Sequence, residues 1–234
     1  MRMTALMPVL LAMAACGNAD EPTRQTTVTI EKARALRFQV VDNDTGYMRR
    51  VALHVGEDDS GRAANPVARA AGVAAREDVW KIEGTNQVGR DWYLEAFDRG
   101  PVTGRVQLAS YFARLGHEYA VPVGYEVAFE QTEPGRWRSY YVQDQVVLDG
   151  TAIAAAEASV DPEDRPIVMV DLTDDGARDF GELTLRITGK KLAMLSRDEV
   201  LSAPVVNGQI AGGQISISLD RAADAEALAK ALAP

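Results

Sequence analysis

Cysteine and histidine are scarce in this 234-residue chain, which has one cysteine, Cys16, and two histidines, His54 and His117. A single cysteine excludes a disulfide framework within the chain. Zinc sites are built mostly from Cys and His ligands, so the sequence holds too few of them for a zinc centre. The acidic run Gly56–Gly61, "GEDDSG", lacks the ligand spacing of a calcium loop, and a solvated loop is the simpler interpretation.

Recognisable catalytic motifs are missing as well. No serine lies in a Gly-x-Ser-x-Gly nucleophile elbow, and the Gly189–Lys190 pair lacks the spacing of a phosphate-binding loop. An acid pair stays open as an alternative, because a sequence does not show which carboxylates meet in space. We predict a protein that is not an enzyme, with no catalytic, cofactor-binding or metal-binding residues and no cofactor.

Positive charge is in deficit, with 25 Lys and Arg against 34 Asp and Glu and a formal net charge of -9. Such an acidic chain repels the phosphate backbone of nucleic acids, so we expect no nucleic-acid partner. Hydrophobic residues make up 47% of the sequence, which suffices for a normal core in one large domain or two small ones.

The chain also lacks an apolar run long enough to span a bilayer as a helix. The run Ala5–Ala15 is too short for that, but its length is typical of an export signal. The motif "LAMAAC", which ends at Cys16, resembles the lipobox of bacterial lipoproteins. That resemblance implies cleavage before Cys16 and attachment of lipid, such as palmitate, to its sulfur. The alternative is an ordinary signal peptide with a chance cysteine beside the cleavage site.

These features predict a signal peptide at residues 1–15 and a flexible polar tether at residues 16–25. The lipid would attach the protein to a membrane of the bacterial cell envelope, facing the periplasm. Gly17 after the cysteine favours the outer membrane over the inner membrane.

Apolar alternation predicts a core strand at Leu36, Phe38 and Val40. The stretch Tyr119–Leu148 predicts a β-hairpin with its turn at "EPGR", and Arg165–Leu172 predicts a buried strand. No period is sustained between Gly56 and Gly116, and that region has no structural interpretation from its sequence.

The clearest helix should follow Thr173 as its cap and stop at Gly189. Its expected buried stripe consists of Ala177, Phe180, Leu183 and Ile187. Asp220 should cap a second, Ala-rich helix that runs towards Leu232. We therefore expect an α+β fold, a mixed or antiparallel sheet with helices packed on one face.

Two glycine pairs, Asn207–Gly208 and Gly212–Gly213, lie between the strand-like segments "VLSAPVV" and "QISISL". We interpret Asn207, Gly208, Gly212 and Gly213 as a structural turn, in which glycines permit a bulge or a close crossing. A phosphate loop is the alternative, but no Lys and Ser/Thr follow at the required spacing. The segment "VLSAPVV", Val200–Val206, is a candidate sheet edge for strand addition, or else a covered strand.

The segment Leu148–Leu232 resembles the periplasmic head region of SecD, a component of the SecD/SecF protein-export complex. The resemblance is carried by "DDGARDFGELT", "GKKLAM", "VLSAPVV" and "IAGGQIS", which occur in the family's order. Upstream, "LRFQVVD" and "VPVGYEV" resemble edges of the same periplasmic domain. The turn "SRDE" departs from the family pattern, and the stretch between Asp42 and Val121 is longer than usual in the family.

The resemblance implies a SecD-like base region at residues 26–147, with an unexplained insertion at about 56–116, and a SecD-like head at residues 148–234. It implies a lipid-anchored periplasmic binding protein, an accessory in protein export or envelope protein handling without proton-coupled activity of its own. Exported polypeptide and Sec or envelope proteins are the implied partners. The alternative is a structural or partner-binding lipoprotein that reuses the head fold with no Sec role.

Overall fold

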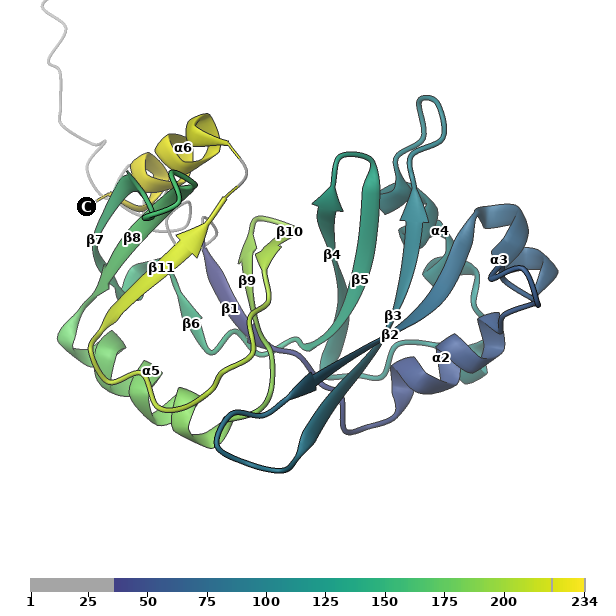
Figure 1. Cartoon of the computed structure of the whole chain (residues 1–234), viewed down its shortest axis with the longest axis horizontal. Coiled ribbons are helices and arrows are strands. Elements are labelled where there is room, and N and C mark those ends of the chain that lie inside the picture. The colour runs from purple at the N-terminus through teal and green to yellow at the C-terminus, as the bar shows by residue number, and fades with distance from the viewer. Residues whose placement is uncertain (1–35, 220, 234) are drawn as a thin grey trace, which may run out of the picture.

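The structure, a computed structural model, describes residues 36–219 and 221–233. Cys16, the signal peptide and the tether predicted above lie outside the described residues. Two β-sheets form the framework (Figure 1). The larger sheet has the strand order β2-β3-β5-β4-β10-β9-β1-β6, and the smaller sheet has the order β11-β8-β7.

One end of the larger sheet, which we call the first half-sheet, is made of four strands: β2 (Val73–Lys81), β3 (Val88–Phe97), β5 (Arg136–Gln143) and β4 (Tyr125–Glu133). Three α-helices pack on it: α2 (Tyr47–Val55), α3 (Pro66–Ala71) and α4 (Gly104–Arg114). A short 3-10 helix, η1 (His117–Tyr119), follows α4. The core between these elements includes Tyr47, Leu94, Leu108 and Trp137.

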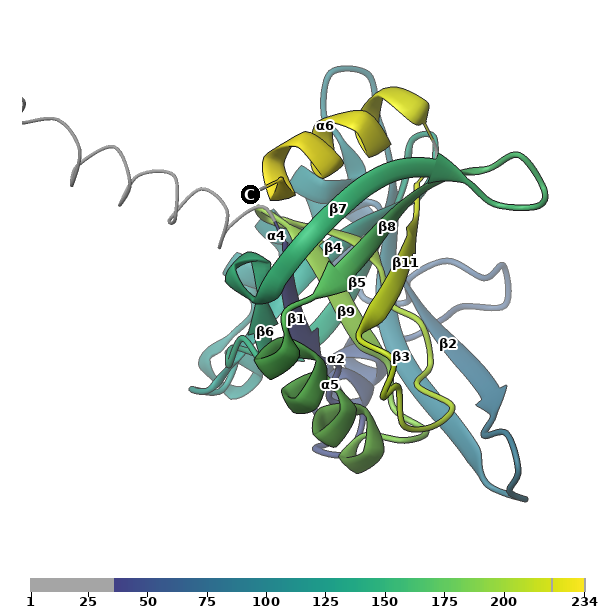
Figure 2. The ribbon, with the colours of Figure 1, turned by 90° about the vertical axis from the view of Figure 1, so that its left-hand side faces the viewer.

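The other end, the second half-sheet, contains β10 (Glu199–Ser202), β9 (Leu192–Ser196), β1 (Arg37–Val40) and β6 (Leu148–Asp149). It faces the three-stranded sheet of β7 (Ile153–Val160), β8 (Pro166–Leu172) and β11 (Gln214–Ser218). The remaining helices are η2 (Gly150–Ala152), α5 (Asp174–Arg186) and α6 (Ala222–Leu232). Figure 2 shows α6 near one end of the three strands and α5 near the other.

The helices cover one face of the larger sheet. Phe38 and Met194 are opposite each other on β1 and β9, and both point into the core that contains α5 and α6. Phe129 on β4 points to the same side, into the core of α2 and α4. Their neighbours in sequence, such as Ala128 and Leu195, form a smaller cluster on the opposite face. The α+β fold with helices on one face is thus confirmed.

The first half-sheet is a continuous insertion in the second. Residues 42–146 leave β1 and return to β6, and their ends meet where Val41 bridges Val142 and the Asp42 amide donates to the Tyr141 carbonyl. The two half-sheets are joined by a parallel pairing of β10 with β4 whose register is a single pair, Glu199 with Phe129. This seam positions the groove described below.

Several local predictions are confirmed. β4 and β5 form the predicted hairpin, with Gly135 at positive φ in its turn. The Thr173 hydroxyl caps α5 by accepting from the Gly176 amide. Phe180 is buried in the core. α5 ends at Arg186, three residues before the predicted stop at Gly189, which takes a positive φ in the turn that follows. The region 56–116, which had no interpretation, forms α3, β2, β3 and α4.

Other expectations need revision. Arg221 is the N-cap residue of α6 and makes no capping side-chain bond, while Asp220, the predicted cap, lies outside the described residues. The prediction that Val200–Val206 is an outer strand of a sheet is wrong, because β10 lies between β9 and β4. Val206 is 4% exposed and belongs to the core, so its side chain packs instead of facing solvent.

Candidate functional site

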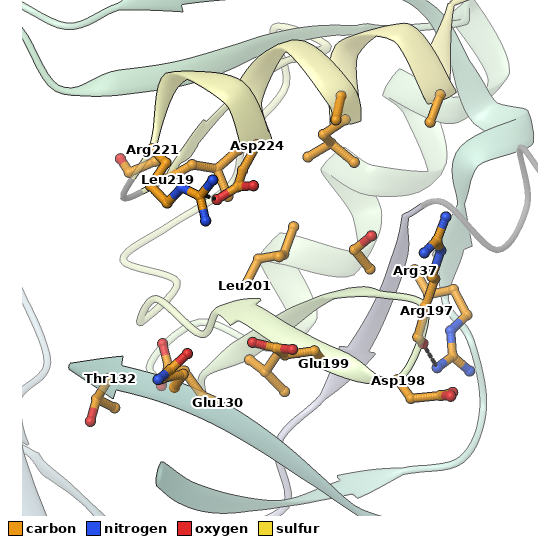
Figure 3. Close-up of a pocket in the computed structure, with 17 residues that line it drawn as sticks. Arg37, Glu130, Thr132, Arg197, Asp198, Glu199, Leu201, Leu219, Arg221 and Asp224 are labelled. Atoms are coloured by element: carbon orange, nitrogen blue, oxygen red, sulfur yellow. Dashed lines mark hydrogen bonds and ion pairs between the residues drawn. The ribbon is translucent and has the colours of Figure 1, made fainter. Parts of the chain in front are cut away.

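A groove of about 1310 Å³ opens at the seam between the two half-sheets. Among the described residues, β10 and β4 pair only through Glu199 and Phe129, and the two strands separate beyond that pair. Helix α6 and the end of β11 lie over the space that this leaves (Figure 3). The lining includes Glu130, Gln131 and Thr132 of β4, Ser196–Leu201 around the β9–β10 turn, Ser218 and Leu219 after β11, and Arg221, Asp224, Ala227, Leu228 and Ala231 of α6, together with Arg37.

One part of the groove is apolar. Leu201 projects from β10 towards α6 in Figure 3, and Leu219 lies near the start of that helix. Leu228, Ala227 and Ala231 contribute the facing side of α6. Leu201 and Leu219 are only partly buried, so apolar surface remains accessible within the groove.

Charged groups surround this apolar surface. The Arg37 Nη2 atom donates to the Arg197 carbonyl at 2.6 Å, which fixes one end of the groove. Arg221 and Asp224 form an exposed pair with 3.7 Å between Nε and Oδ2 at the start of α6. At the β4 wall, the Tyr140 hydroxyl donates to Glu130 Oε2 at 2.6 Å.

Glu199 is an acid of the groove whose pKa is shifted by its surroundings. Burial raises the pKa of its carboxyl group, Arg105 lowers it, and Asp224 of α6 raises it further. Arg105 reaches this end of the seam from α4, where its Nη2 atom donates to the Asp198 carbonyl at 3.1 Å. The arrangement therefore keeps a partly buried carboxylate beside the apolar surface.

A second polar cluster lies away from the groove and joins the two half-sheets. The Lys191 Nζ atom lies 2.8 Å from Asp78 Oδ2 and 3.4 Å from Asp91 Oδ2, and Arg138 binds the same two carboxylates at 3.0 and 3.1 Å. The Lys191 ammonium also lies 4.6 Å from the centre of the Trp80 ring. We call these five residues the ionic joint.

Charge balance explains how the ionic joint tolerates burial. Two cations meet two carboxylates, and Asp91 and Lys191 have side chains 3% and 7% exposed. Burial raises the pKa of Asp91, and the nearby Lys191 and Arg138 oppose that rise. Burial also acts to raise the pKa of Asp78, but hydrogen bonds from Lys191 and Arg138 outweigh it and lower that pKa. With every charge paired, the ionic joint holds β2 and β3 against the segment that enters β9.

The groove carries groups that can bind a polypeptide. Across residues 36–219 and 221–233, no three His, Cys, Asp or Glu side chains are grouped so as to hold a metal ion. The groove offers carboxylates, guanidinium groups, apolar side chains and strand backbone, which are the elements that recognise a peptide. Each helix in the part of the chain that the structure describes is too short or too polar to cross a bilayer.

The predicted turn residues lie on the irregular connection between β10 and β11, which runs beside α5. Asn207 and Gly208 close no hairpin, because β10 and β11 belong to different sheets. Gly213 has a φ of 66°, and a Cβ atom there would lie 2.8 Å from the Cβ of Ala177 on α5. Nothing lies within 4 Å of the equivalent position on Gly208 or Gly212.

Sequence reasoning missed the groove and the ionic joint. The groove brings together β4, β10 and α6, which are far apart in the chain, and no local motif marks that meeting. The ionic joint pairs Lys191 with acids about a hundred residues earlier, namely Asp91 at a separation of 100 and Asp78 at 113. The one available signal was "EDVWK", in which acids and an aromatic residue crowd a strand from a region that seemed featureless.

Comparison with known proteins finds similarity to SecD over the second half of the chain. Residues 126–233 match the family model described as SecDF, P1 head subdomain. The protein translocase subunit SecD of Rickettsia felis is 37% identical over 93 residues, covering 40% of this chain and 18% of the relative. SecD of Acidaminococcus fermentans is 36% identical over 89 residues, covering 38% and 21%. The aligned region is thus a small part of these relatives' length.

A solved structure of SecDF, described as a membrane component that enhances protein export, aligns with 95% of this chain and 71% of its own chain. Its sequence identity is 20% and its TM-score is 0.43.

Proposed function

We propose, from the premise that residues 126–233 form a head domain of the SecD type, that this protein binds extended polypeptide in the cell envelope. The groove between β4, β10 and α6 is the binding site. The protein acts as an accessory in protein export or envelope protein handling, performs no chemistry on its ligand and has no proton-coupled activity of its own. Lipid on Cys16 holds it to a membrane, facing the periplasm, with the outer membrane favoured.

The observation that carries this proposal is the separation of β10 from β4 beside an accessible apolar surface. Strands that part in this way leave backbone groups along the groove that can pair with an added strand. Leu201 and Leu219 provide contact for apolar side chains at the same place. Backbone pairing with shallow apolar contact suits a protein that handles many sequences, because backbone groups are the same in every polypeptide.

The test is a titration of a fluorescently labelled, unfolded exported protein with the full chain in detergent, followed by fluorescence anisotropy. We expect saturable binding that weakens about tenfold or more in Leu201→Arg, since that variant removes roughly one leucine contact and adds a charge. Leu185→Arg is the matched control, because Leu185 is 59% exposed on α5 and does not line the groove.

Circular dichroism establishes that both variants are folded. Absence of saturable binding by the unaltered chain would refute the proposal and leave a structural envelope lipoprotein as the better interpretation. Equal loss in both variants would place the binding site elsewhere.

A further inference from the structure

The α-helices on the first half-sheet carry positive charge and no negative charge. α2, α3 and α4 contain two, one and two arginines, and none of the three contains Asp or Glu. The helices of the other half are acidic instead: α5 has four acids and two arginines, and α6 has two acids and one lysine. In a chain with a formal net charge of -9, the layer of α2, α3 and α4 is therefore a cationic surface on an acidic protein.

Most acids near this layer lie on the other face of the sheet or in one loop. On β3, Asp91 and Glu95 alternate with Leu94, whose side chain packs against the helices, so the two acids point to the opposite face. The loop before α3 contains the acidic run Glu57–Asp59. Within that run, Asp58 pairs with Arg69 of α3 at 3.1 Å. The surface between α3 and α4 is thus left with cations.

A hollow of about 260 Å³ lies between α3 and α4 on this surface. Three valines line it, Val67, Val102 and Val106, and they are 57%, 42% and 52% exposed. Arg99 and Arg114 line it as well, and its other lining residues are uncharged. Exposed apolar side chains that cluster in this way indicate a surface that contacts a partner.

The two arginines of the hollow are available to an anion. Neither forms an ion pair with another residue in the ranges 36–219 and 221–233. Asp98, the acid next to Arg99, instead accepts hydrogen bonds from the Gly104 amide at 2.7 Å and from the Trp137 indole at 3.1 Å. The Arg99 guanidinium lies over Gly72 at the end of α3, where the Cβ atom of any other residue would overlap it. Gly72 therefore leaves the space that holds this cation beside the hollow.

We infer that the face of α3 and α4 around this hollow lies against a membrane surface that contains anionic lipid. Lipid phosphate groups pair with Arg99 and Arg114, and the three valines enter the boundary between head groups and acyl chains. Figure 1 shows α3 and α4 at the opposite end of the molecule from α6, so a chain held by this face keeps α6 away from the bilayer.

The lipid proposed on Cys16 favours a membrane over a soluble acidic partner. Residues 17–35 separate Cys16 from the first described residue, and such a stretch spans at most about 65 Å when extended. The lipid thus keeps the cationic face within reach of the bilayer, and one lipid chain with a cationic patch binds a membrane more firmly than either alone. The inference uses the lipid to choose the partner and does not rest on the groove.

The test uses the full chain with Cys16→Ser, which cannot take the lipid, and measures co-sedimentation with vesicles. The vesicles consist of phosphatidylcholine alone or of equal parts of phosphatidylcholine and phosphatidylglycerol. We expect tighter binding to the anionic vesicles, and added salt should weaken it. Arg99→Gln/Arg114→Gln should lower that affinity about tenfold to thirtyfold, the effect of removing two arginines from an anionic surface. Residues 1–35 are the same in every chain compared, so a difference between variants reports on the face.

Matched variants separate this face from the overall charge and hydrophobicity of the chain. Arg178→Gln/Arg186→Gln removes the same charge from exposed positions of α5, outside the hollow, and should change binding far less. Val67→Ser/Val106→Ser should weaken binding to the anionic vesicles about tenfold, because the two side chains no longer enter the bilayer. Leu185→Ser, at an exposed position of α5, should leave it nearly unchanged. Circular dichroism establishes that each variant is folded.

Absence of binding, or equal binding to the two kinds of vesicle, overturns this inference. An equal loss of binding in Arg178→Gln/Arg186→Gln also overturns it. Self-association of the chain without vesicles, if lost in Arg99→Gln/Arg114→Gln, assigns the face to the acidic helices of a second copy and overturns the membrane contact. The proposed groove and the proposed lipid stay intact in each case, because the measurement uses neither of them.

Discussion

Phe180 shows how one residue supports the core of the second half-sheet. Its side chain is 2% exposed, and its ring meets the Phe38 ring edge-on with 5.8 Å between centroids. We expect Phe180→Ala to lower the free energy of unfolding by about 3 to 5 kcal/mol, the usual effect of emptying a buried aromatic site. Denaturant unfolding measures the change. Leu185→Ala, at an exposed position of the same helix, should change it little, and a similar loss in both variants would contradict this role for Phe180.

Glu199 should make stability depend on pH in a direction opposite to that of most acids. Its folded-state pKa is raised, so the folded protein binds this proton more tightly than the unfolded chain does. The ionised Glu199 carboxylate destabilises the folded protein. This effect is absent below the ordinary glutamate pKa of about 4.3 and grows as the pH rises through the raised pKa of the folded state.

Glu199→Gln should therefore melt at a higher temperature than the unaltered protein at pH 8, and at nearly the same temperature at pH 4. Thermal melts at both pH values measure the difference. A melting temperature lowered at pH 8 would mean that the carboxylate is a structural partner and not a group available to a ligand.

At the scale of elements, Gly213 allows the connection before β11 to pass close to α5. Gly213→Ala should destabilise the protein by about 1 to 2 kcal/mol from its positive φ, with a further penalty from the approach to Ala177. Gly208→Ala is the control, because nothing lies within 4 Å of that position and its φ is not positive. Chemical denaturation of both variants tests the difference, and equal effects would show that the close crossing has no energetic role.

The ionic joint ties β2 and β3 to the start of β9. Lys191→Met leaves Asp91 buried beside one cation instead of two, and we expect a loss of about 3 to 5 kcal/mol at neutral pH. Without Lys191 the pKa of Asp91 rises further, so protonation at acid pH should relieve part of the penalty.

The test measures the free energy of unfolding of three variants, Lys191→Met, Asp91→Asn and the double variant, at pH 7 and pH 5. These values give the interaction energy between the two residues. Additive effects would show that the pair does not interact. The expected result is a double variant more stable than the sum of the two single losses predicts.

Local signals explain which elements the sequence could predict. α5 has a Thr173 cap and a regular apolar stripe, and the β4–β5 hairpin has alternating residues and a Pro-Gly turn, so each is encoded within one short stretch. β7 and β2 lack such signals. β7 consists largely of small Ala residues, so its two faces differ little in hydrophobicity, and in β2 the alternation of apolar and polar residues is weak because most of its residues are partly exposed. The groove depends on where β10 and β4 part, which is a property of the assembled sheet and not of either strand.

At the scale of the whole molecule, the proposed lipid on Cys16 decides where the protein resides. We expect Cys16→Ser to move the protein from the membrane fraction to the soluble fraction, because the chain then has no acylated residue and the described helices do not span a bilayer. Fractionation after a high-salt wash measures this. A Cys16→Ser variant that still pellets with membranes under those conditions would contradict the lipid anchor.

The insertion of residues 42–146 between β1 and β6 also sets the order in which the molecule can fold. The first half-sheet can complete its own pairings as soon as that continuous stretch has been made, since β2, β3, β4 and β5 pair with one another. β1 can then pair with β6 through Phe38 and Leu148, but its pairing with β9 must wait, because the long stretch between Phe38 and Met194 delays that contact. The earliest described strand to be synthesised thus keeps one edge unpaired until β9 has been made. Until the later elements that pack on it have been made, its apolar face is exposed, and the nascent protein is itself an unfolded ligand of the kind that its finished groove would bind.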